Sequence, residues 1–254
     1  GLKFAADGRC TDIPGQKDIP ARANIRHYPI EERWNVVWIW MGDPAKADPT
    51  KIEELPWLDS PEWTATPGYL HVKSSYLLLI DNLLDLTHVA YVHKKTISGD
   101  PREGTTPTRT ERLDGGIRNG RWMIDFVPPP LFAKAGGFTT NVDRWQFVTW
   151  KAPATLYLDV GCAKTGTGAP QGDRSQGISI WSTHLVTPET ETTTHYHFCA
   201  ILRNPMVRSP QEAAVIEREM NELRRIAFDE QDKKVLEAQQ RTVDRAGGMA
   251  ALRE

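Results

Sequence analysis

Two histidines and two carboxylates lie close together in an otherwise mainly apolar stretch that runs from Asp81 to His93. Within it, Asp85 precedes His88 by three residues, and His93 follows His88 by five. Neutral imidazoles with a carboxylate are the ligands of mononuclear ferrous sites that leave positions open for oxygen. Burying several ionisable side chains without partners or a function is costly. The pattern therefore indicates an iron site to which His88 and His93 each contribute a ligand.

The spacing of the two histidines sets a geometric condition on the helix that carries them. At about 100° per residue, Asp85 and His88 lie about 60° apart, whereas His88 and His93 lie about 140° apart. Both histidines can bind one metal only if the helix is distorted, and we expect a bulge or unwinding near residues 90–92. Without the apolar context, this spacing would more often belong to two hydrogen-bonded core histidines.

The third ligand must come from elsewhere, and the C-terminal region offers Asp229, Glu230 and Asp232. Asp232 has apolar residues four positions before it and three and four positions after it, which places it on an inward-facing stripe of a helix. Asp229 instead has Arg225 four positions before it and Lys233 four positions after it. We therefore predict Asp232 as the third ligand, with Glu230 as the alternative.

A second possible metal site is formed by His195 and His197. Alternate residues of a strand point to the same face, as in cupin-type metal centres. The sequence suggests no carboxylate near this pair, and two alternating histidines on a strand more often belong to a sheet surface. A cupin-like metalloenzyme is kept as an alternative.

The elements that position these residues follow from hydrophobic periodicity and turn residues. Residues 1–43 alternate short β-type runs with turns, residues 44–67 form a proline-rich connector, and residues 68–254 form the main domain. Within the main domain we predict a helix from Tyr76 to His93. Strands of an antiparallel sheet are predicted at 109–113, 120–127, 143–150, 155–162, 177–185 and 192–202.

A long C-terminal helix is predicted from a capping pattern. Ser209 can cap the helix, Pro210 suits its first position, and Glu212 completes a capping box. The helix is expected to extend to about Gln240.

Composition limits the classes of partner. The chain has 254 residues, 31 of them basic and 33 acidic, so nothing indicates nucleic-acid binding or a polybasic membrane anchor. No apolar run approaches the roughly 20 residues of a membrane span, and small molecules are the expected partners.

Three widely spaced cysteines fit no disulfide framework, so a cytoplasmic location is expected. The chain begins at Gly1 in the middle of a pattern, as a fragment of a longer protein would.

The segment Asp-Asn-Leu-Leu-Asp-Leu-Thr-His, with the later Tyr-Val-His, resembles the iron-binding helix of Rieske-type aromatic ring-hydroxylating oxygenases. Its amino-acid sequence is similar to that of the vanillate O-demethylase and dicamba monooxygenase branch of the oxygenase (alpha) subunits. The first residues, from Gly1 to Pro14, resemble the end of a Rieske domain. Residues 181–190 and the C-terminal helix resemble the catalytic domain of the same branch. The resemblance covers nearly the whole chain.

The resemblance implies an α+β fold. Residues 68–254 would form a START-like helix-grip catalytic domain, in which an antiparallel sheet wraps around a long helix, and residues 1–43 would be the C-terminal remnant of a Rieske β domain. A mononuclear Fe(II) would use O₂ to hydroxylate or O-demethylate a carboxylated or methoxylated aromatic substrate, with monooxygenation favoured over dioxygenation. The alternative is a metal-free START-like module that binds a hydrophobic ligand.

Roles for further residues and partners are implied by the same resemblance. Asp85 and Asn82 would be catalytic, with Asp85 connecting His88 to a Rieske-cluster histidine of a neighbouring subunit. Lys151 and His184 would lie in the substrate pocket. The C-x-H and C-x-x-H pairs that hold a [2Fe-2S] cluster are absent, so these ligands would lie upstream in the full-length protein. A ferredoxin, an NAD(P)H-dependent reductase or both would supply electrons to a homotrimer.

Overall fold

The computed structural model describes residues 1–60, 63–94, 96–203 and 209–251. The chain divides into two compact units, Gly1–Ser60 and Pro61–Glu254. The first unit holds two small hairpins, which pair β1 (Lys3–Phe4) with β2 (Cys10–Asp12) and β3 (Ile30–Arg33) with β4 (Val36–Ile39). The division falls inside the expected connector 44–67, and the first strand of the second unit already begins at Trp63.

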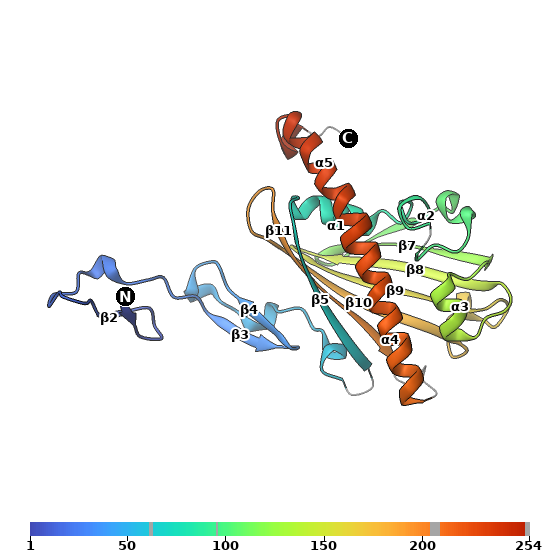
Figure 1. Ribbon diagram of the computed structural model, residues 1–254, viewed down its shortest axis with the longest axis horizontal. Helices are drawn as coiled ribbons and strands as arrows, with labels where there is room; N and C mark the ends of the chain where they lie inside the picture. The colour runs from blue at the N-terminus through green and yellow to red at the C-terminus, as the bar shows by residue number, and fades with distance from the viewer. Residues whose placement is uncertain (61–62, 95, 204–208, 252–254) are drawn as a thin grey trace. The chain divides into compact units, whose positions relative to one another are not determined.

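The second unit is built on a seven-stranded antiparallel sheet in the order β5-β11-β10-β9-β8-β7-β6 (Figure 1). Its strands are β5 (Trp63–Val72), β6 (Arg109–Leu113), β7 (Gly116–Phe126), β8 (Val142–Lys151), β9 (Thr155–Lys164), β10 (Gly177–Pro188) and β11 (Thr194–Arg203). The antiparallel sheet predicted from alternating hydrophobicity and short connections is confirmed.

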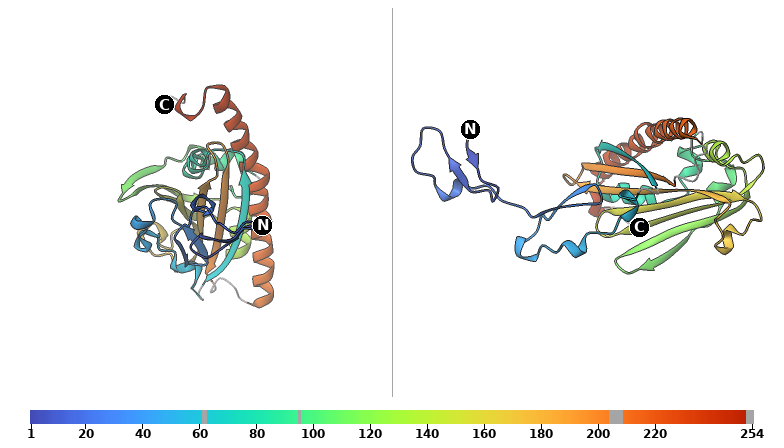
Figure 2. Two further views of the ribbon diagram at one scale, coloured as in Figure 1. Left: turned by 90° about the vertical axis from the view of Figure 1, so that its left-hand side faces the viewer. Right: turned by 90° about the horizontal axis from the view of Figure 1, so that it is seen from below.

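The helices of this unit gather on one side of the sheet (Figure 2). They are α1 (Tyr76–Leu84), α2 (Val89–Val92), α3 (Pro130–Gly136), α4 (Pro210–Arg224), the π-helix η8 (Arg225–Asp232) and α5 (Lys233–Arg245). The main core lies between α1, α5 and the sheet, and includes Val72, Leu79, Leu83, Leu156, Val186 and Leu236. The predicted α+β class is confirmed. Among the described residues, no helix is both long and apolar enough to cross a membrane.

The helix expected over residues 76–93 is interrupted. The interruption between α1 and α2, at Asp85–His88, lies before the region 90–92 where the distortion is predicted, and the short helix α2 itself ends at Val92. The Asp85 carboxylate accepts hydrogen bonds from the backbone nitrogen and hydroxyl of Thr87, at 2.8 and 2.5 Å. Such local bonds from an aspartate compete with helical hydrogen bonding, and α1 ends at Leu84, four residues before His88.

The C-terminal helix also differs from the prediction. It begins at Pro210 as expected, but it changes to π-helical pairing at η8 and ends at Arg245 instead of near Gln240. The side chain of Glu212, which the predicted capping box requires, lies outside the described residues. π-Helical segments are rare and are frequently found at functional sites, and this eight-residue segment ends on Asp232.

Candidate metal centre

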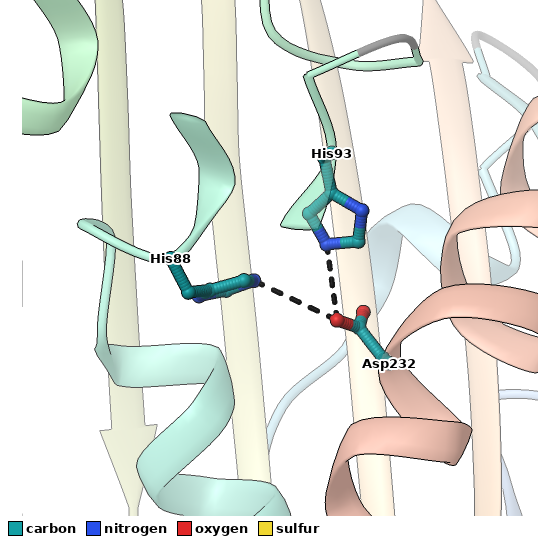
Figure 3. Close-up of side chains that lie close together, drawn as sticks. All are labelled: His88, His93 and Asp232. Carbon is teal, nitrogen blue, oxygen red and sulfur yellow. Dashed lines mark ion pairs between the residues drawn. The ribbon is translucent and has the colours of Figure 1, made fainter. Parts of the chain in front are cut away.

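The structure brings His88, His93 and Asp232 together, although they come from both ends of the second unit. The Nε2 atom of His93 lies 3.0 Å from Oδ1 of Asp232, and Nε2 of His88 lies 3.7 Å from the same oxygen. Figure 3 shows the three side chains pointing toward one another. One potential ligand atom from each residue falls within a group whose members are all within 4.8 Å of one another. Within the described part of the chain, no other such group of three metal-ligating residues is found.

The short helix α2 explains how two histidines with this spacing reach one point. His88 stands at its N-cap and His93 at its C-cap, where the backbone has already left helical geometry (φ −105°, ψ 21°). The two residues therefore flank a single helical turn and need not share the face of a regular helix. The requirement for a distorted helix is met by breaks at both ends of α2.

Each histidine ring is oriented by one oxygen atom, a backbone carbonyl for His88 and a side-chain amide for His93. Nδ1 of His88 donates to the backbone carbonyl oxygen of Asp85, and Nδ1 of His93 donates to Oε1 of Gln231 at 2.8 Å. Gln231 also accepts from the hydroxyl of Thr96 at 3.1 Å. Because both Nδ1 atoms carry the proton, both Nε2 atoms present lone pairs toward Asp232, which is the tautomer that a metal requires. Gln231 was not predicted, and only its position beside Asp232 could have suggested it.

The electrostatics of the cluster fit a cation. Asp232 is 5 % exposed and His93 is 1 % exposed. With His93 neutral and protonated on Nδ1, Oδ1 of Asp232 has no hydrogen-bond donor among the described residues. Burial acts to lower the pKa of His93, but its hydrogen bonds and the charge of Asp232 outweigh burial and raise that pKa. Two imidazoles and a carboxylate that meet at one point are a suitable donor set for Fe(II).

The neighbouring carboxylates of the π-helix point elsewhere. Glu230, the alternative third ligand, is exposed and pairs with Arg225 at 2.6 Å. Asp229 pairs with Lys233 at 3.4 Å. Only Asp232 of these acidic residues points into the protein, as its apolar flanking residues predict.

Asp85 and Asn82 lie beside the cluster in different ways. The Asp85 side chain is exposed and bonded to Thr87, so the expectation that its carboxylate holds His88 is wrong, because the backbone carbonyl of Asp85 does so. Asn82 lines a cavity of about 10 Å³ together with Tyr196 and Asp232. That volume suffices for about one water molecule.

The two expected substrate-binding residues are separated. Lys151 pairs with Thr155, which pairs with Leu185, and paired residues of adjacent strands share a face of the sheet. His184, next to Leu185, therefore points to the opposite face from Lys151. Lys151 donates to the backbone carbonyl of Asp114 at 2.8 Å. A joint Lys151 and His184 pocket is not formed.

His184 lies on the face of the sheet that the helices cover. It is fully buried, and its Nδ1 lies 2.6 Å from the Tyr196 hydroxyl, whereas its Nε2 has no hydrogen-bond partner among the described residues. Burial, aided by the charge of Arg224, lowers the pKa of His184 to about 3. The imidazole is therefore neutral, and it packs against Phe198 and Phe228.

The rival histidine pair lies on the other face of the sheet. Register places His195 opposite His71 and His197 opposite Tyr69. Nδ1 of His195 lies 2.9 Å from the Tyr69 hydroxyl, and His71 pairs with Glu189 at 2.7 Å. Among the described residues, His195 and His197 join no close group of three ligating side chains. Their arrangement is that of an exposed sheet surface.

Comparison with known proteins defines the class. Residues 72–251 match the family described as vanillate O-demethylase oxygenase C-terminal domain. The chain therefore belongs to the vanillate O-demethylase family of Rieske-type oxygenase alpha subunits, as the resemblance predicts.

Individual relatives agree with this membership. The chain is 45 % identical over 202 residues to the toluene-4-sulfonate monooxygenase system iron-sulfur subunit of Comamonas testosteroni, covering 78 % of this chain and 58 % of that protein. It is similar to dicamba monooxygenase bound to dicamba, with 31 % identity, a TM-score of 0.83 and coverage of 97 % and 70 % of the two chains. Dicamba monooxygenase with non-haem iron and dicamba has 28 % identity and a TM-score of 0.74, and covers 100 % and 70 %. The chain thus spans little more than half the length of the first relative.

Proposed function

We propose that this chain is the catalytic part of a Rieske-type monooxygenase in which His88, His93 and Asp232 hold one mononuclear Fe(II). The observation that supports this proposal most strongly is that one potential ligand atom from each of His88, His93 and Asp232, all largely buried, lies within 4.8 Å of the others. A module that only binds an apolar ligand would have no use for such a costly arrangement.

The residues of this chain prepare the site for oxygen chemistry. These two histidines and one carboxylate would hold ferrous iron with coordination positions left open, and the iron would supply the activation of dioxygen. Gln231 and the Asp85 carbonyl hold the two rings in the ligating tautomer. Apolar side chains, among them Leu79, Phe228 and Leu236, line the small cavity beside Asp232.

The substrate proposed is an aromatic anion, either a carboxylate or a sulfonate, which is hydroxylated or O-demethylated. His184 supports this proposal, because it is neutral and its Nε2 is buried and unbonded among the described residues. If the Tyr196 hydroxyl donates to Nδ1, then Nε2 carries a proton and can donate to an anionic oxygen. Two of the similar proteins are named for toluene-4-sulfonate and for dicamba.

The electron supply is proposed from the exposure of Asp85. Its carboxylate is at the surface, while its backbone carbonyl contacts the ring of His88. A [2Fe-2S] cluster of a neighbouring subunit in a homotrimer could therefore connect through Asp85 to the metal ligand. We propose that a ferredoxin, an NAD(P)H-dependent reductase or both reduce that cluster, in the cytoplasm, and that residues 1–43 belong to a Rieske domain.

Turnover by the full-length protein tests this function. With its electron donor and NAD(P)H, aromatic sulfonates and carboxylates should stimulate O₂ uptake and gain one oxygen atom, or lose a methyl group as formaldehyde. Asp232→Asn should abolish both readouts, and Glu230→Gln should retain them. Substrate binding without any turnover in an iron-loaded protein would contradict the proposal and favour a binding module.

A further inference from the structure

The segment that carries both histidines is held from the sheet by a buried arginine. Arg121 of β7 is 3 % exposed and pairs in register with Gln146 of β8. Its Nε donates to Oε1 of Gln146 at 2.9 Å, so the guanidinium has a fixed orientation on the face of the sheet that the helices cover. Adjacent strand residues such as Trp145 point to the opposite face.

The remaining nitrogens of Arg121 reach both ends of the histidine segment. Nη2 donates to the backbone carbonyl of Leu86 at 2.8 Å, just before His88. Nη1 donates to the backbone carbonyl of Glu103, in the short 3₁₀ helix Pro101–Thr105 that follows His93 in the chain. A planar guanidinium can make these bonds simultaneously because its donors form a rigid fork. One side chain therefore ties residues 86 and 103 together across the part of the chain that contains both ligands.

Neighbouring polar side chains hold other points of the same segment. Asn119, two residues before Arg121 on β7, donates to the carbonyl of Leu84 at 2.7 Å. Arg144 of β8 donates to the carbonyl of Ile97 at 2.9 Å and forms a buried ion pair with Glu103. The backbone before His88 and after His93 is thus fixed by a polar row on β7 and β8.

Among the described residues, no carboxylate accepts a hydrogen bond from Arg121. All of its described hydrogen bonds end on neutral oxygens, those of Gln146 and of the backbone. Burying a guanidinium without a directly bonded carboxylate is costly. This cost is offset by hydrogen bonds whose common effect is to order the ligand-bearing backbone.

We propose that Arg121 is a positioning residue for the metal centre. By tying the backbone on either side of His88 and His93, it holds the two imidazoles at the separation that one metal ion requires. This inference rests on the proposed function, since it concerns the same centre. It assigns Arg121 no contact with the metal or the substrate.

The test compares metal affinity and metal geometry in matched variants. Arg121→Lys keeps the buried charge but loses the fork, and Arg121→Met loses both. Arg174→Met is the control, because Arg174 is a partly buried arginine that pairs with Asp159 at 2.8 Å and lies over the ring of Trp145 on the other face. Co(II) serves as the probe, since its visible absorption reports the coordination geometry without turnover.

Arg121→Lys should bind Co(II) about 10- to 100-fold more weakly, as changes to groups that orient ligands typically do, and should show an altered absorption spectrum. Arg174→Met should keep both properties even if its thermal stability falls. An Arg121→Lys protein with unaltered affinity and spectrum would overturn the inference, as would an equal loss in Arg174→Met. Absence of Co(II) binding by the unmodified protein would instead contradict the proposed metal centre itself.

Discussion

His93 and Asp232 lie 3.0 Å apart, between Nε2 and Oδ1, and Gln231 contacts the other nitrogen of the same ring. Two consecutive residues of the π-helix therefore hold one imidazole from both sides. This relationship gives the two residues separate roles in the proposed centre: Gln231 fixes the tautomer of His93, and Asp232 is the proposed metal ligand.

Gln231→Leu removes the acceptor for Nδ1 of His93 and frees the ring to rotate or change tautomer. We expect about 10- to 100-fold weaker Fe(II) binding, measured anaerobically by competition with a chelator. Gln231→Glu is the matched control, because its carboxylate can still accept the Nδ1 proton. Equal affinities for Gln231→Leu and the unmodified protein would show that the contact does not orient the ligand.

Asp85→Asn should separate electron delivery from metal binding. The ring of His88 is held by the backbone carbonyl of residue 85, so iron affinity should stay close to that of the unmodified protein. Turnover by the full-length protein should nevertheless fall strongly, because the exposed carboxylate is altered. Loss of iron from this variant would indicate that the side chain, and not the backbone, supports His88.

His184 should be required for binding an aromatic anion, whereas Lys151 should not. The two side chains point to opposite faces of the sheet, and Lys151 is bonded to the Asp114 carbonyl. His184→Gln should therefore raise the Kd for an aromatic sulfonate, and Lys151→Met should leave it nearly unchanged in calorimetric titrations. The reverse order of effects would place the anion on the other face.

His184 should also make the protein sensitive to acid. Its pKa is lowered from 6.5 to about 3 in the folded state, so the unfolded chain binds the extra proton between these values. The contribution to stability is complete above pH 6.5 and is lost as pH falls toward 3, by up to about 1.4 kcal/mol per pH unit. Urea unfolding across this range should show a shallower pH dependence in His184→Gln, and an identical slope would contradict the assignment.

The three proposed ligands can be predicted from the sequence because their chemistry is local. His88 and His93 stand out as ionisable residues in an apolar segment, and Asp232 is marked by the apolar residues around it on the helix. The strands are predictable for the same reason, since alternation is visible over a few residues.

Other features depend on contacts that no local pattern encodes. The break before His88 reflects the bond between Asp85 and Thr87, which competes with a helix that the apolar periodicity favours. The opposite orientations of Lys151 and His184 follow from strand register, and a shift of one residue would reverse them. In the sequence, Arg121 cannot be told from an ordinary strand residue. Only its contacts in the structure indicate the proposed role in positioning the two histidines.

The central claim is most directly tested by the iron content after anaerobic reconstitution with Fe(II). Five proteins should be compared: the unmodified chain, His88→Ala, His93→Ala, Asp232→Asn and His197→Ala. The account predicts stoichiometric iron in the unmodified protein and in His197→Ala, with iron lost from the other three. Stoichiometric iron that survives the changes at His88, His93 and Asp232, or that depends on His197, would contradict it.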